Sequence, residues 1–594
     1  MLFSFHSICG KSYIITINLQ ESAVDNKKIA DVLDDIGDML EIMGQSRFRY
    51  LAYHRASQVI RSMPRDLEEV RREEGLTSIK GIGSGIAEKL NELLDTGRMG
   101  YFEELKKSLP GSLTEMVHIQ GIGPKKAKIF YEKLGIETID QLEEAVAVGK
   151  IQEIPGMGVK TEENIERGLE VYRGYEGRLL LNQAIPIAEH IIDYLNRDGL
   201  VDNISTAGSL RRWQETIGDI DILAATKRHS EVADKFCTYP ETSSVLAKGD
   251  TKCSILLHSG LQIDLRMIDP EHYGAALQYF TGSKAHNIHL REIVKKKGLK
   301  LSEYGLFRIK DDMNIAAKTE EDIYKALGMT LMEPELREDK GEIEAAIDGS
   351  LPHLVKLVDI KGDLHIHTKA SDGQSSLEEI ADSCQELGYE YACITDHAFD
   401  LKVAHGLDVK RFEDQWKEID ELNKAFDNFT LLKGVELNID NKGGVDFDDD
   451  FLGRYDVVLA SIHMGFGQSK DQITDRIIAA MENPHIDMVC HPTGRILGRR
   501  PPYSINMEKI IEAASRTRTF LELNAFPDRL DLSDDQLRAA KQAGSKIAIN
   551  TDAHHFYHLA YMRYGLHTAK RGWLEKEDVV NTFTLEKLKK LLVK

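Results

Sequence analysis

The chain has 594 residues, a formal net charge of −21 and 42% hydrophobic residues. At about 100–200 residues per domain this length indicates about three to five domains, and the acidic balance argues against a protein that coats DNA, although it leaves room for a local DNA-binding groove. No apolar run reaches the ~20 residues of a membrane span, and the six cysteines form no Cys-x-x-Cys pair. We therefore expect a soluble protein of a reducing cytoplasm, without disulfides or zinc fingers.

The first part of the chain is predicted to consist of an extension and then helices. Residues 1–23 share no pattern with the helical segments after them and are interpreted as an N-terminal extension or the product of a start codon placed too early. From Asn26, apolar residues recur at helical spacing, and a second helix is predicted from Phe48 to near Met63. We assign residues 24–105 and 106–177 to two helical domains.

Three segments share one pattern, in which an apolar residue precedes Gly-x-Gly and a helix comes after it: residues 81–83, 121–123 and 156–158. Two glycines let a backbone hairpin approach a phosphate closely and direct N–H groups at it. The repeat resembles helix-hairpin-helix motifs, which hold the DNA backbone without reading its sequence. The first two segments match better, and the third is alternatively structural. The predicted DNA contacts are Gly81, Gly83, Gly121, Gly123 and a base-stacking Tyr53, with a terminal 5′-phosphate at the first hairpin.

Two acidic stretches predict a metal site on a sheet. Asp219 and Asp221 alternate with isoleucines, so both carboxylates point from one face of a strand, and Asp264 lies on the polar face of a predicted adjacent strand. Carboxylates in this arrangement can grip two metal ions that hold a triphosphate. A lone Gly-Asp-x-Asp is more commonly a turn with surface aspartates. Here a predicted phosphate-holding group accompanies it: Gly208, Ser209, Arg212 and Gly218.

The order of these motifs, completed by Tyr279-Phe280-Thr281-Gly282-Ser283, resembles family X DNA polymerases, the group that contains polymerase beta. The resemblance implies a nucleotidyltransferase palm at residues 178–275 and a nucleotide-selecting thumb at 276–335. It implies magnesium or manganese at Asp219, Asp221 and Asp264. The Tyr279–Phe280 backbone would crowd the sugar 2′ position beside Gly282, Asn287 would meet the incoming base, and Arg291 would reach the template.

Three further residues bear on that resemblance. Lys252 resembles a residue that contacts the template strand, whereas Lys284 and Gln262 replace an aspartate and an arginine of the vertebrate enzyme, so fidelity and rate are not carried over. Lys89 matches the Schiff-base lysine of a deoxyribose-phosphate lyase site, but Gly85 stands where the vertebrate enzyme has a second lysine. The alternative for Lys89 is a solvated helix lysine.

Beyond a predicted linker at residues 336–360, short strands alternate with helices, and acids or histidines recur where strands end. Ligands at the carboxyl ends of successive strands converge at one rim of a βα barrel. Residues 361–594 resemble the PHP (polymerase and histidinol phosphatase) domain, a distorted βα barrel. The resemblance implies about two or three zinc or manganese ions. The matched ligands are His365, His367, Asp372, His397, Glu436, His463, His491, Asp552 and His554.

The fold class predicted is therefore multidomain, α+β and α/β. The leading functional hypothesis is a DNA polymerase that fills short gaps in DNA repair, with a PHP 3′-5′ exonuclease that also opens abasic sites or removes 3′-phosphates. Its partners would be gapped or nicked DNA and deoxynucleoside triphosphates, without a membrane, and the protein would be a monomer. The alternatives are a PHP phosphatase of small phosphate esters and a non-catalytic scaffold that binds DNA ends.

Overall fold

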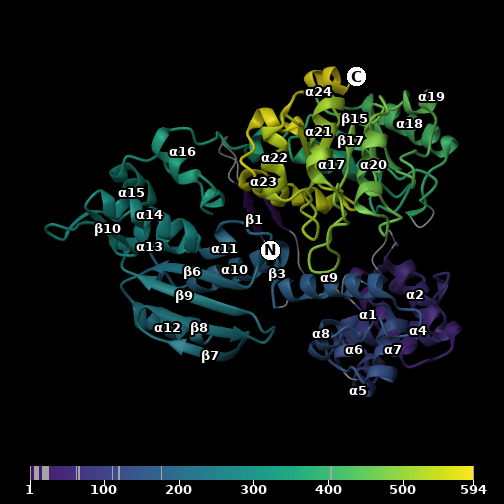
Figure 1. Cartoon of the computed structure of the whole chain (residues 1–594), viewed down its shortest axis with the longest axis horizontal. Coiled ribbons are helices and arrows are strands. Elements are labelled where there is room, and N and C mark those ends of the chain that lie inside the picture. Colours follow the sequence, from purple (N-terminus) through teal and green to yellow (C-terminus); the bar gives the residue numbers. More distant parts are fainter. Residues whose placement is uncertain are drawn as a thin grey trace. The chain divides into compact units, whose positions relative to one another are not determined.

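The computed structural model describes residues 2–5, 13–16, 26–61, 63, 67–109, 111–117, 119, 121–175, 177–401 and 404–592. The chain divides into two compact units, residues 1–170 and 171–594, which are described separately (Figure 1). Among the described residues, no helix combines the length and the apolar character needed to cross a membrane. The predicted extension falls largely outside the described residues; within it, β1 (Leu2–Phe5) and β2 (Tyr13–Thr16) pair antiparallel.

The first unit is helical beyond those strands, as the apolar spacing predicts. Its first helix, α1 (Asn26–Ile42), buries Ile29, Leu33 and Ile36 completely. These side chains lie three or four positions apart, so they form one stripe facing the core. The other helices are α2 (Arg47–Arg61), α3 (Leu67–Glu73), η1 (Leu76–Ser78), α4 (Ser84–Thr96), α5 (Gly100–Ser108), α6 (Gly111–Met116), α7 (Pro124–Leu134), α8 (Ile139–Ala147) and α9 (Val159–Tyr175), which crosses the unit boundary.

The second unit begins with a five-stranded sheet in the predicted palm. Its strand order is β4 (Asn203–Thr206), β6 (Asp219–Ala225), β9 (Gln262–Ile268), β8 (Lys252–Leu257) and β7 (Thr242–Lys248) (Figure 1). The helices α10 (Leu181–Asn196) and α12 (His229–Cys237) share one buried apolar cluster with the sheet. A two-stranded sheet, β3 (Leu179–Leu180) with β5 (Thr216–Ile217), and the short α11 (Gly208–Arg211) complete this part. The strand predicted beside Asp219 and Asp221 is β9, and it runs parallel to β6.

The predicted thumb has its own small core. It contains η2 (Pro270–His272), α13 (Tyr273–Thr281), α14 (Lys284–Lys296), the strands β10 (Leu299–Ser302), β11 (Gly305–Arg308) and β12 (Met313–Ala316), α15 (Glu320–Leu327) and η3 (Pro334–Leu336). The segment predicted as a linker, residues 336–360, contains α16 (Glu342–Asp348), so part of that prediction is wrong. Ile343 and Ala346 of this helix are buried in the thumb core, because the acidic stretch also carries an apolar face.

Seven parallel strands form the C-terminal barrel in sequence order. They are β13 (Gly362–Ile366), β14 (Tyr391–Ile394), β15 (Thr430–Asn438), β16 (Val457–Ser461), β17 (Met488–Val489), β18 (Phe520–Asn524) and β19 (Ile547–Asn550). A parallel bridge between Ile366 and Ala553 brings the chain after the last strand back to the first. The predicted distorted βα barrel is therefore confirmed as a nearly closed barrel.

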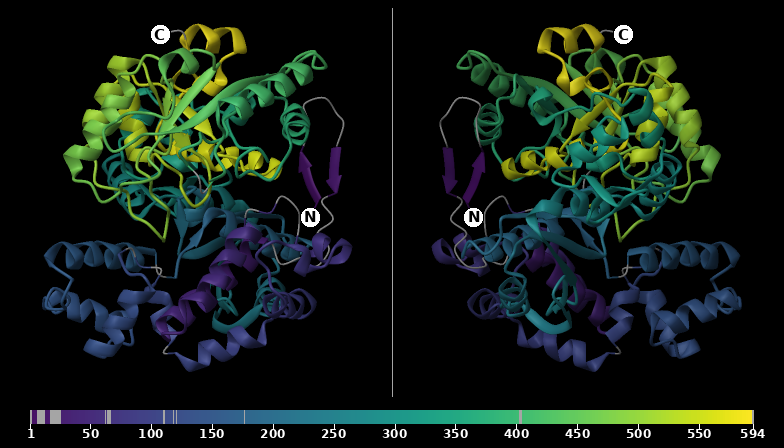
Figure 2. Two further views of the ribbon diagram at one scale, coloured as in Figure 1. Left: turned by 90° about the vertical axis from the view of Figure 1, so that its right-hand side faces the viewer. Right: turned by 90° about the vertical axis from the view of Figure 1, so that its left-hand side faces the viewer.

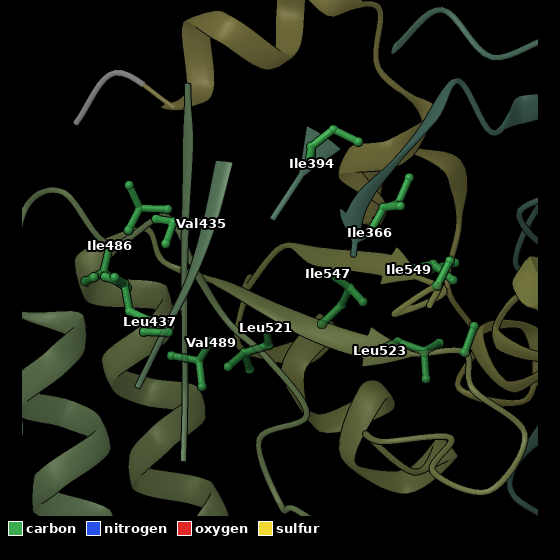
Figure 3. Close-up of a cluster of buried hydrophobic side chains, with 14 of the residues drawn as sticks. Ile366, Ile394, Val435, Leu437, Ile486, Val489, Leu521, Leu523, Ile547 and Ile549 are labelled. Carbon is green, nitrogen blue, oxygen red and sulfur yellow. The ribbon is translucent and has the colours of Figure 1, made fainter. Parts of the chain in front are cut away.

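Helices surround these strands (Figure 2). They are η4 (Leu357–Asp359), α17 (Leu377–Glu386), α18 (Val409–Asn423), α19 (Asp449–Leu452), α20 (Lys470–Met481), α21 (Met507–Thr517), α22 (Asp534–Gln542), η6 (Phe556–Tyr561), α23 (Met562–Arg571), η7 (Lys576–Asp578), η8 (Val580–Thr582) and α24 (Leu585–Leu592). Alternate strand residues such as Val435, Leu437, Leu521 and Leu523 belong to one buried cluster with helix residues (Figure 3). Because strand side chains alternate, the residues between them, including Glu436 and Glu522, are directed to the opposite side.

Candidate active sites

The three predicted palm acids lie on two paired strands. In the parallel register of β6 and β9, Asp219 stands opposite Gln262 and Asp221 stands opposite Asp264. Gly208 precedes them at a φ of +58°, and a Cβ on it would lie 2.2 Å from the Asp221 Oδ2 atom. A side chain at position 208 would therefore strike a predicted metal ligand as well as strain the backbone. The structure brings the acids and the Gly208–Ser209 turn together as the sequence indicates.

Asp221 and Asp264 are held in different electrostatic settings. Burial, and after it the charges of Asp219 and Asp264, raises the pKa of Asp221 to about 6. Burial acts in the same direction on Asp264, but hydrogen bonds from Lys252, Gln262 and Ser254 outweigh it and lower the pKa of this carboxyl. Asp264 therefore stays ionised beside a neighbour that resists ionisation, which is the setting in which a bound cation stabilises the pair.

Lys252 forms an ion pair with the predicted metal ligand Asp264. Its Nζ atom is 2.6 Å from Asp264 Oδ2, and Gln262 Nε2 donates to Asp264 Oδ1 at 2.9 Å. The ammonium is paired across the β8–β9 ladder, but its side chain is 36% exposed, so the template contact of Lys252 stays a prediction. The ammonium supplies a positive charge beside the position at which Gln262 replaces an arginine of the vertebrate enzyme.

The residues predicted to hold the triphosphate lie in α11, just after it and just before β6. Ser209 lies in α11, and Gly218 directly precedes β6, where a Cβ would meet Arg178 Nη1 at 3.0 Å. Arg212 donates through Nε to Glu338 Oε1 at 2.8 Å and through Nη1 to the Thr281 carbonyl at 2.8 Å. Its guanidinium is therefore held between the palm and the end of the thumb.

In the thumb, Asn287 fixes the turn after α13. Its Nδ2 donates to the carbonyls of Tyr279 at 2.7 Å and Gly282 at 3.0 Å. A Cβ on Gly282 would lie 2.9 Å from Asn287 Oδ1, so glycine is required for this close approach. Arg291 Nε donates to the Asn287 carbonyl at 3.0 Å, which keeps the arginine close to this turn. The Cζ atom of Arg266 lies 4.7 Å from the centre of the Phe280 ring. Asn287 thus holds the Tyr279–Phe280 backbone that is predicted to face the sugar.

The three glycine hairpins have the same backbone geometry. Their first glycines, Gly81, Gly121 and Gly156, adopt φ of 105°, 89° and 88°. Their second glycines, at 83, 123 and 158, precede α4, α7 and α9, and a Cβ on each would meet no atom within 4 Å. Internal packing does not demand glycine at those second positions, so the missing side chain serves to leave the backbone N–H groups accessible. The third hairpin is formed as fully as the first two.

Two residues of the first unit depart from their predicted settings. Tyr53 is only 6% exposed and its ring stacks near Tyr101, with centroids 6.2 Å apart, so it cannot stack on a base without moving. Its predicted base contact is therefore corrected. Lys89 lies on α4 with Nζ 2.8 Å from the Gly85 carbonyl and 4.9 Å from the centre of the Tyr101 ring. The amine is thus accessible to solvent, but it already donates a hydrogen bond to the Gly85 carbonyl.

At the barrel rim, five of the nine predicted ligands, all histidines, lie around a sixth, Glu436. One of its oxygens, Oε2, lies 3.3 Å from His365 Nε2, 3.4 Å from His367 Nε2 and 3.1 Å from His397 Nδ1. The other, Oε1, lies 3.2 Å from His463 Nε2 and 3.0 Å from His491 Nε2. Two ligand atoms that each bind one metal at ~2.1 Å in tetrahedral geometry stand about 3.4 Å apart. These spacings therefore fit atoms that would hold metal ions, and Glu436 would offer both of its oxygens to them.

Asp372 and Asp552 extend this centre. Asp552 Oδ1 is 3.3 Å from His367 Nε2, whereas Asp372 Oδ2 is 3.5 Å from both His397 Nε2 and His554 Nε2. The ring Nδ1 atoms of His367 and His491 are buried and have no hydrogen-bond partner among the described residues. Buried nitrogens without a partner are costly unless they bind something else, so the donor set fits about two or three metal ions.

Burial alone would lower the pKa of His365, but the carboxylates around it, led by Glu522, raise that pKa well above its ordinary value. Glu522 is a functional residue that the sequence patterns did not identify. Its Oε1 lies 2.7 Å from His365 Nδ1, and its Oε2 accepts from the His491 backbone N–H at 2.7 Å. A carboxylate on the second nitrogen of a ligating histidine orients the ring. The signal was present, because Glu522 is a single acid between Leu521 and Leu523 in a strand whose first two residues are also apolar.

Two more residues near the centre were also missed. Ser461 donates to Glu436 Oε1 at 2.6 Å, and Arg529 Nε lies 3.8 Å from Asp552 Oδ2. Ser461 precedes the predicted ligand His463 by two residues, whereas nothing in the pattern around Arg529 indicates its place. A guanidinium at the edge of a metal centre is suited to a phosphate oxygen.

Four family models match the chain: helix-hairpin-helix domain at residues 24–99, SAM-like helix-hairpin-helix tandem at 113–170, DNA polymerase beta thumb at 276–338 and PHP domain at 363–526. The chain is 38% identical over 568 residues to the DNA polymerase/3′-5′ exonuclease PolX of Bacillus subtilis, covering 95% of this chain and 99% of that protein. It is 30% identical over 233 residues to a protein of Thermoanaerobacter sp. named "Probable phosphatase", covering 37% of this chain and 89% of that protein. A protein of the same name from Syntrophotalea carbinolica is 31% identical over 234 residues, covering 38% and 92%.

Proposed function

Since this chain belongs to the DNA polymerase/3′-5′ exonuclease PolX family, we propose that it extends primers in short DNA gaps at the palm and removes 3′-terminal nucleotides at the barrel. The observation that carries the proposal is the presence, in one chain, of two separate ligand sets that suit divalent metals. One lies on β6 and β9, and the other lies at the barrel rim. Both reactions are phosphoryl displacements, which such ions promote by stabilising charge on the attacking and leaving oxygens.

At the palm, the chain's residues position the nucleotide and the primer end. Asp219, Asp221 and Asp264 would hold magnesium or manganese, and the low pKa of Asp264 leaves its carboxylate able to accept a hydrogen bond from the primer hydroxyl. Ser209, Arg212 and the Gly218 backbone would hold the triphosphate. Asn287, which fixes the Tyr279–Phe280 backbone, would place that backbone against the sugar 2′ position, and Arg291 would reach the template.

At the barrel, zinc or manganese would be held by the His365–His367–Asp552 group, the His397–Glu436–His463 group and the group around Asp372. Arg529 lies beside Asp552 and would contact the scissile phosphate. The likeness to proteins named probable phosphatases favours a second activity at this same centre, removal of a terminal 3′-phosphate, with opening of abasic sites as a related hydrolysis.

The hairpins would hold the DNA ends. The accessible N–H groups at Gly83, Gly123 and Gly158 are suited to backbone phosphates, and a 5′-phosphate would sit at the first hairpin. Lys89, on the helix after that hairpin, is the candidate lyase amine. Borohydride trapping on an incised abasic duplex should give a covalent adduct that disappears in Lys89→Ala, and absence of an adduct from the native protein would reject the lyase.

The proposed function is tested by following the length of one 5′-labelled primer in a gapped duplex. With nucleoside triphosphates the primer should lengthen, and without them it should shorten from its 3′ end, in magnesium and in manganese. A small aryl phosphate and a 3′-phosphorylated primer serve as competing substrates. Hydrolysis of the aryl phosphate without any action on DNA would favour the small-ester phosphatase. DNA binding without either reaction would favour the scaffold.

A further inference from the structure

Helix α23 of the barrel contacts the palm. The ring of His567 on this helix stacks on Trp213, the residue after Arg212, with ring centroids 3.6 Å apart and planes inclined by 3°. One turn further on, Arg571 is only 8% exposed. Its Nη1 donates to the Arg212 carbonyl at 3.1 Å and to Glu338 Oε1 at 3.1 Å, and its Nη2 donates to Asp534 Oδ2 at 2.7 Å. A buried arginine of the barrel thus contacts both the backbone of Arg212 and the counter-ion of its side chain.

Glu338 is shared between the two arginines. Its Oε1 atom accepts from Arg212 Nε at 2.8 Å, from Arg571 Nη1 and from Gln214 Nε2. Burial would raise the pKa of Glu338, but Arg212 and then Arg571 outweigh burial and lower it. Arg571 also pairs with Asp534, so its charge is shared between two carboxylates, and the charge of Glu338 is shared between two guanidinium groups. Glu338 therefore neutralises the Arg212 guanidinium only in part.

Arg571 affects how strongly the Arg212 guanidinium can bind a phosphate. If Arg571 were absent, Glu338 would be the counter-ion of Arg212 alone, and a triphosphate would have to compete with a full buried carboxylate for the same guanidinium. Charges that are partly desolvated interact strongly, so this competition is costly. The hydrogen bond from Arg571 to the Arg212 carbonyl also restrains the backbone from which that side chain extends.

We propose that Arg571 of the barrel is a positioning residue of the palm: by sharing Glu338 and holding the Arg212 carbonyl, it keeps the Arg212 guanidinium placed and charged for the triphosphate of the incoming nucleotide. The polymerase site is then incomplete without the PHP barrel. This inference rests on the proposed function, because Arg212 is a triphosphate ligand only if the palm adds nucleotides.

The test is steady-state single-nucleotide insertion on a gapped duplex by the full-length chain. Arg571→Met should raise KM for the nucleoside triphosphate about tenfold and leave kcat within about twofold, because it removes an aid to binding and leaves the metal ligands intact. Removal of 3′-terminal nucleotides should stay unchanged, which also reports that the barrel is folded. Arg571→Lys should restore part of the loss, since it keeps a charge near Glu338 but lacks the second arm that reaches Asp534.

Lys340→Met is the matched control. Lys340 crosses the same interface to Asp534 at 3.2 Å and Asp535 at 2.5 Å, so its ion pairs are with these acids of the barrel and not with Glu338. This variant should leave KM unchanged, so an equal rise in both variants would reduce Arg571 to a structural contact and overturn the proposal. In a Glu338→Gln background, Arg571→Met should change KM by less than about threefold, because the competing carboxylate is gone.

The outcomes separate the two proposals. If the native protein adds no nucleotide, the proposed palm function fails. If the native protein extends primers and Arg571→Met has native KM and kcat, the palm function stands and the role of Arg571 is rejected. Should Arg571→Met fail to fold, as seen by loss of exonuclease activity, the KM values of Arg571→Lys and Lys340→Met decide the question.

Discussion

The palm and the barrel surround their predicted metals with different chemistry. In the palm all three ligands are carboxylates, and their mutual repulsion contributes to a pKa of about 6 at Asp221. In the barrel three carboxylates are interleaved with six histidines, and most of them form groups of three or four whose ligand atoms lie within 4.8 Å of one another. Among the described residues, the palm acids form no group as tight as these. A carboxylate cluster stays spread until cations arrive, whereas an imidazole–carboxylate cluster can assemble beforehand.

The difference bears on which ions each centre suits. Hard magnesium prefers oxygen ligands and keeps several waters, whereas imidazole suits zinc and manganese together with carboxylate. It also bears on stability, because repelling carboxylates cost folding free energy until a metal binds. Substitutions in each region test the comparison, beginning with the largest expected effect.

Asp264→Ala should lower nucleotide addition by roughly a thousandfold or more, because charge stabilisation by the palm metals is worth several kcal/mol. The exonuclease should stay within about twofold, since its ligands lie at the barrel rim. Primer extension and shortening measured on the same duplex give both numbers. Asp269→Asn, at an acid just past β9 that is 52% exposed, is the control and should keep both activities. Extension near the native rate in Asp264→Ala would show that the palm is not the polymerase site.

His365→Ala with His367→Ala should have the reverse effect. Exonuclease activity should fall by roughly a thousandfold and bound metal should decrease, because both rings lie against Glu436 and Asp552. Nucleotide addition should persist. Elemental analysis after dialysis measures the metal, and the exposed His353→Ala is the control. An unchanged metal content would place the ions elsewhere.

Glu320→Gln probes a thumb carboxylate that has permanent cationic partners, Arg211 and Arg337. Burial would raise the pKa of Glu320, but Arg211 and Arg337 outweigh burial and lower it from 4.5 to about 2. Its stabilisation is therefore complete above pH 4.5 and is lost as the pH falls through about 2. The variant should lose about 3 kcal/mol of unfolding free energy at pH 7, and the difference from the native protein should shrink below pH 4.5. Chemical denaturation at several pH values measures this, with the exposed neighbour Glu321→Gln as control.

Asp221→Asn should have the opposite sign. The pKa of Asp221 is raised from 3.8 to about 6, so its ionisation destabilises the folded protein above about pH 6 and costs nothing below pH 3.8. Without metal at pH 7 the variant should be more stable than the native protein by about 1–3 kcal/mol, although it adds no nucleotide. Magnesium should reduce this difference in unfolding free energy, because it stabilises the native protein and not the variant. Equal stability of the two at pH 7 without metal would contradict the repulsion inferred in the palm.

The smallest effect concerns DNA delivery to the centres. Gly83→Val should fold normally, because its φ is −81° and a Cβ would meet nothing within 4 Å. It should weaken binding to gaps carrying a 5′-phosphate about tenfold, by blocking the N–H groups of the first hairpin. Titration against the same gap with a 5′-hydroxyl is the internal control and should give native affinity. If the native protein binds both gaps equally, the first hairpin does not hold the terminal phosphate.

Local patterns in the sequence determined much of this protein. The alternation around Asp219 and Asp221 predicted a strand face, and the predicted neighbour strand with Asp264 pairs with it in register. Ser376 and Glu379, three residues apart, form a capping box at the start of α17, and that spacing can be read from the sequence. The glycine hairpins and the histidines at strand ends could be predicted from the sequence for the same reason. Backbone periodicity, caps and turns depend on residues a few positions apart, so the sequence contains them directly.

Only the tertiary structure decided which side chains meet. Lys252 pairs with Asp264, a contact that no local pattern indicates, because the ladder of β8 with β9 places them together. Tyr53 was predicted to stack on a base and is buried against the core of the first unit. Arg212 and Arg571 lie 359 positions apart, yet a hydrogen bond joins them. Such contacts result from the packing of whole elements, in which burial and charge pairing over long sequence separations outweigh any local preference, so no short pattern contains them.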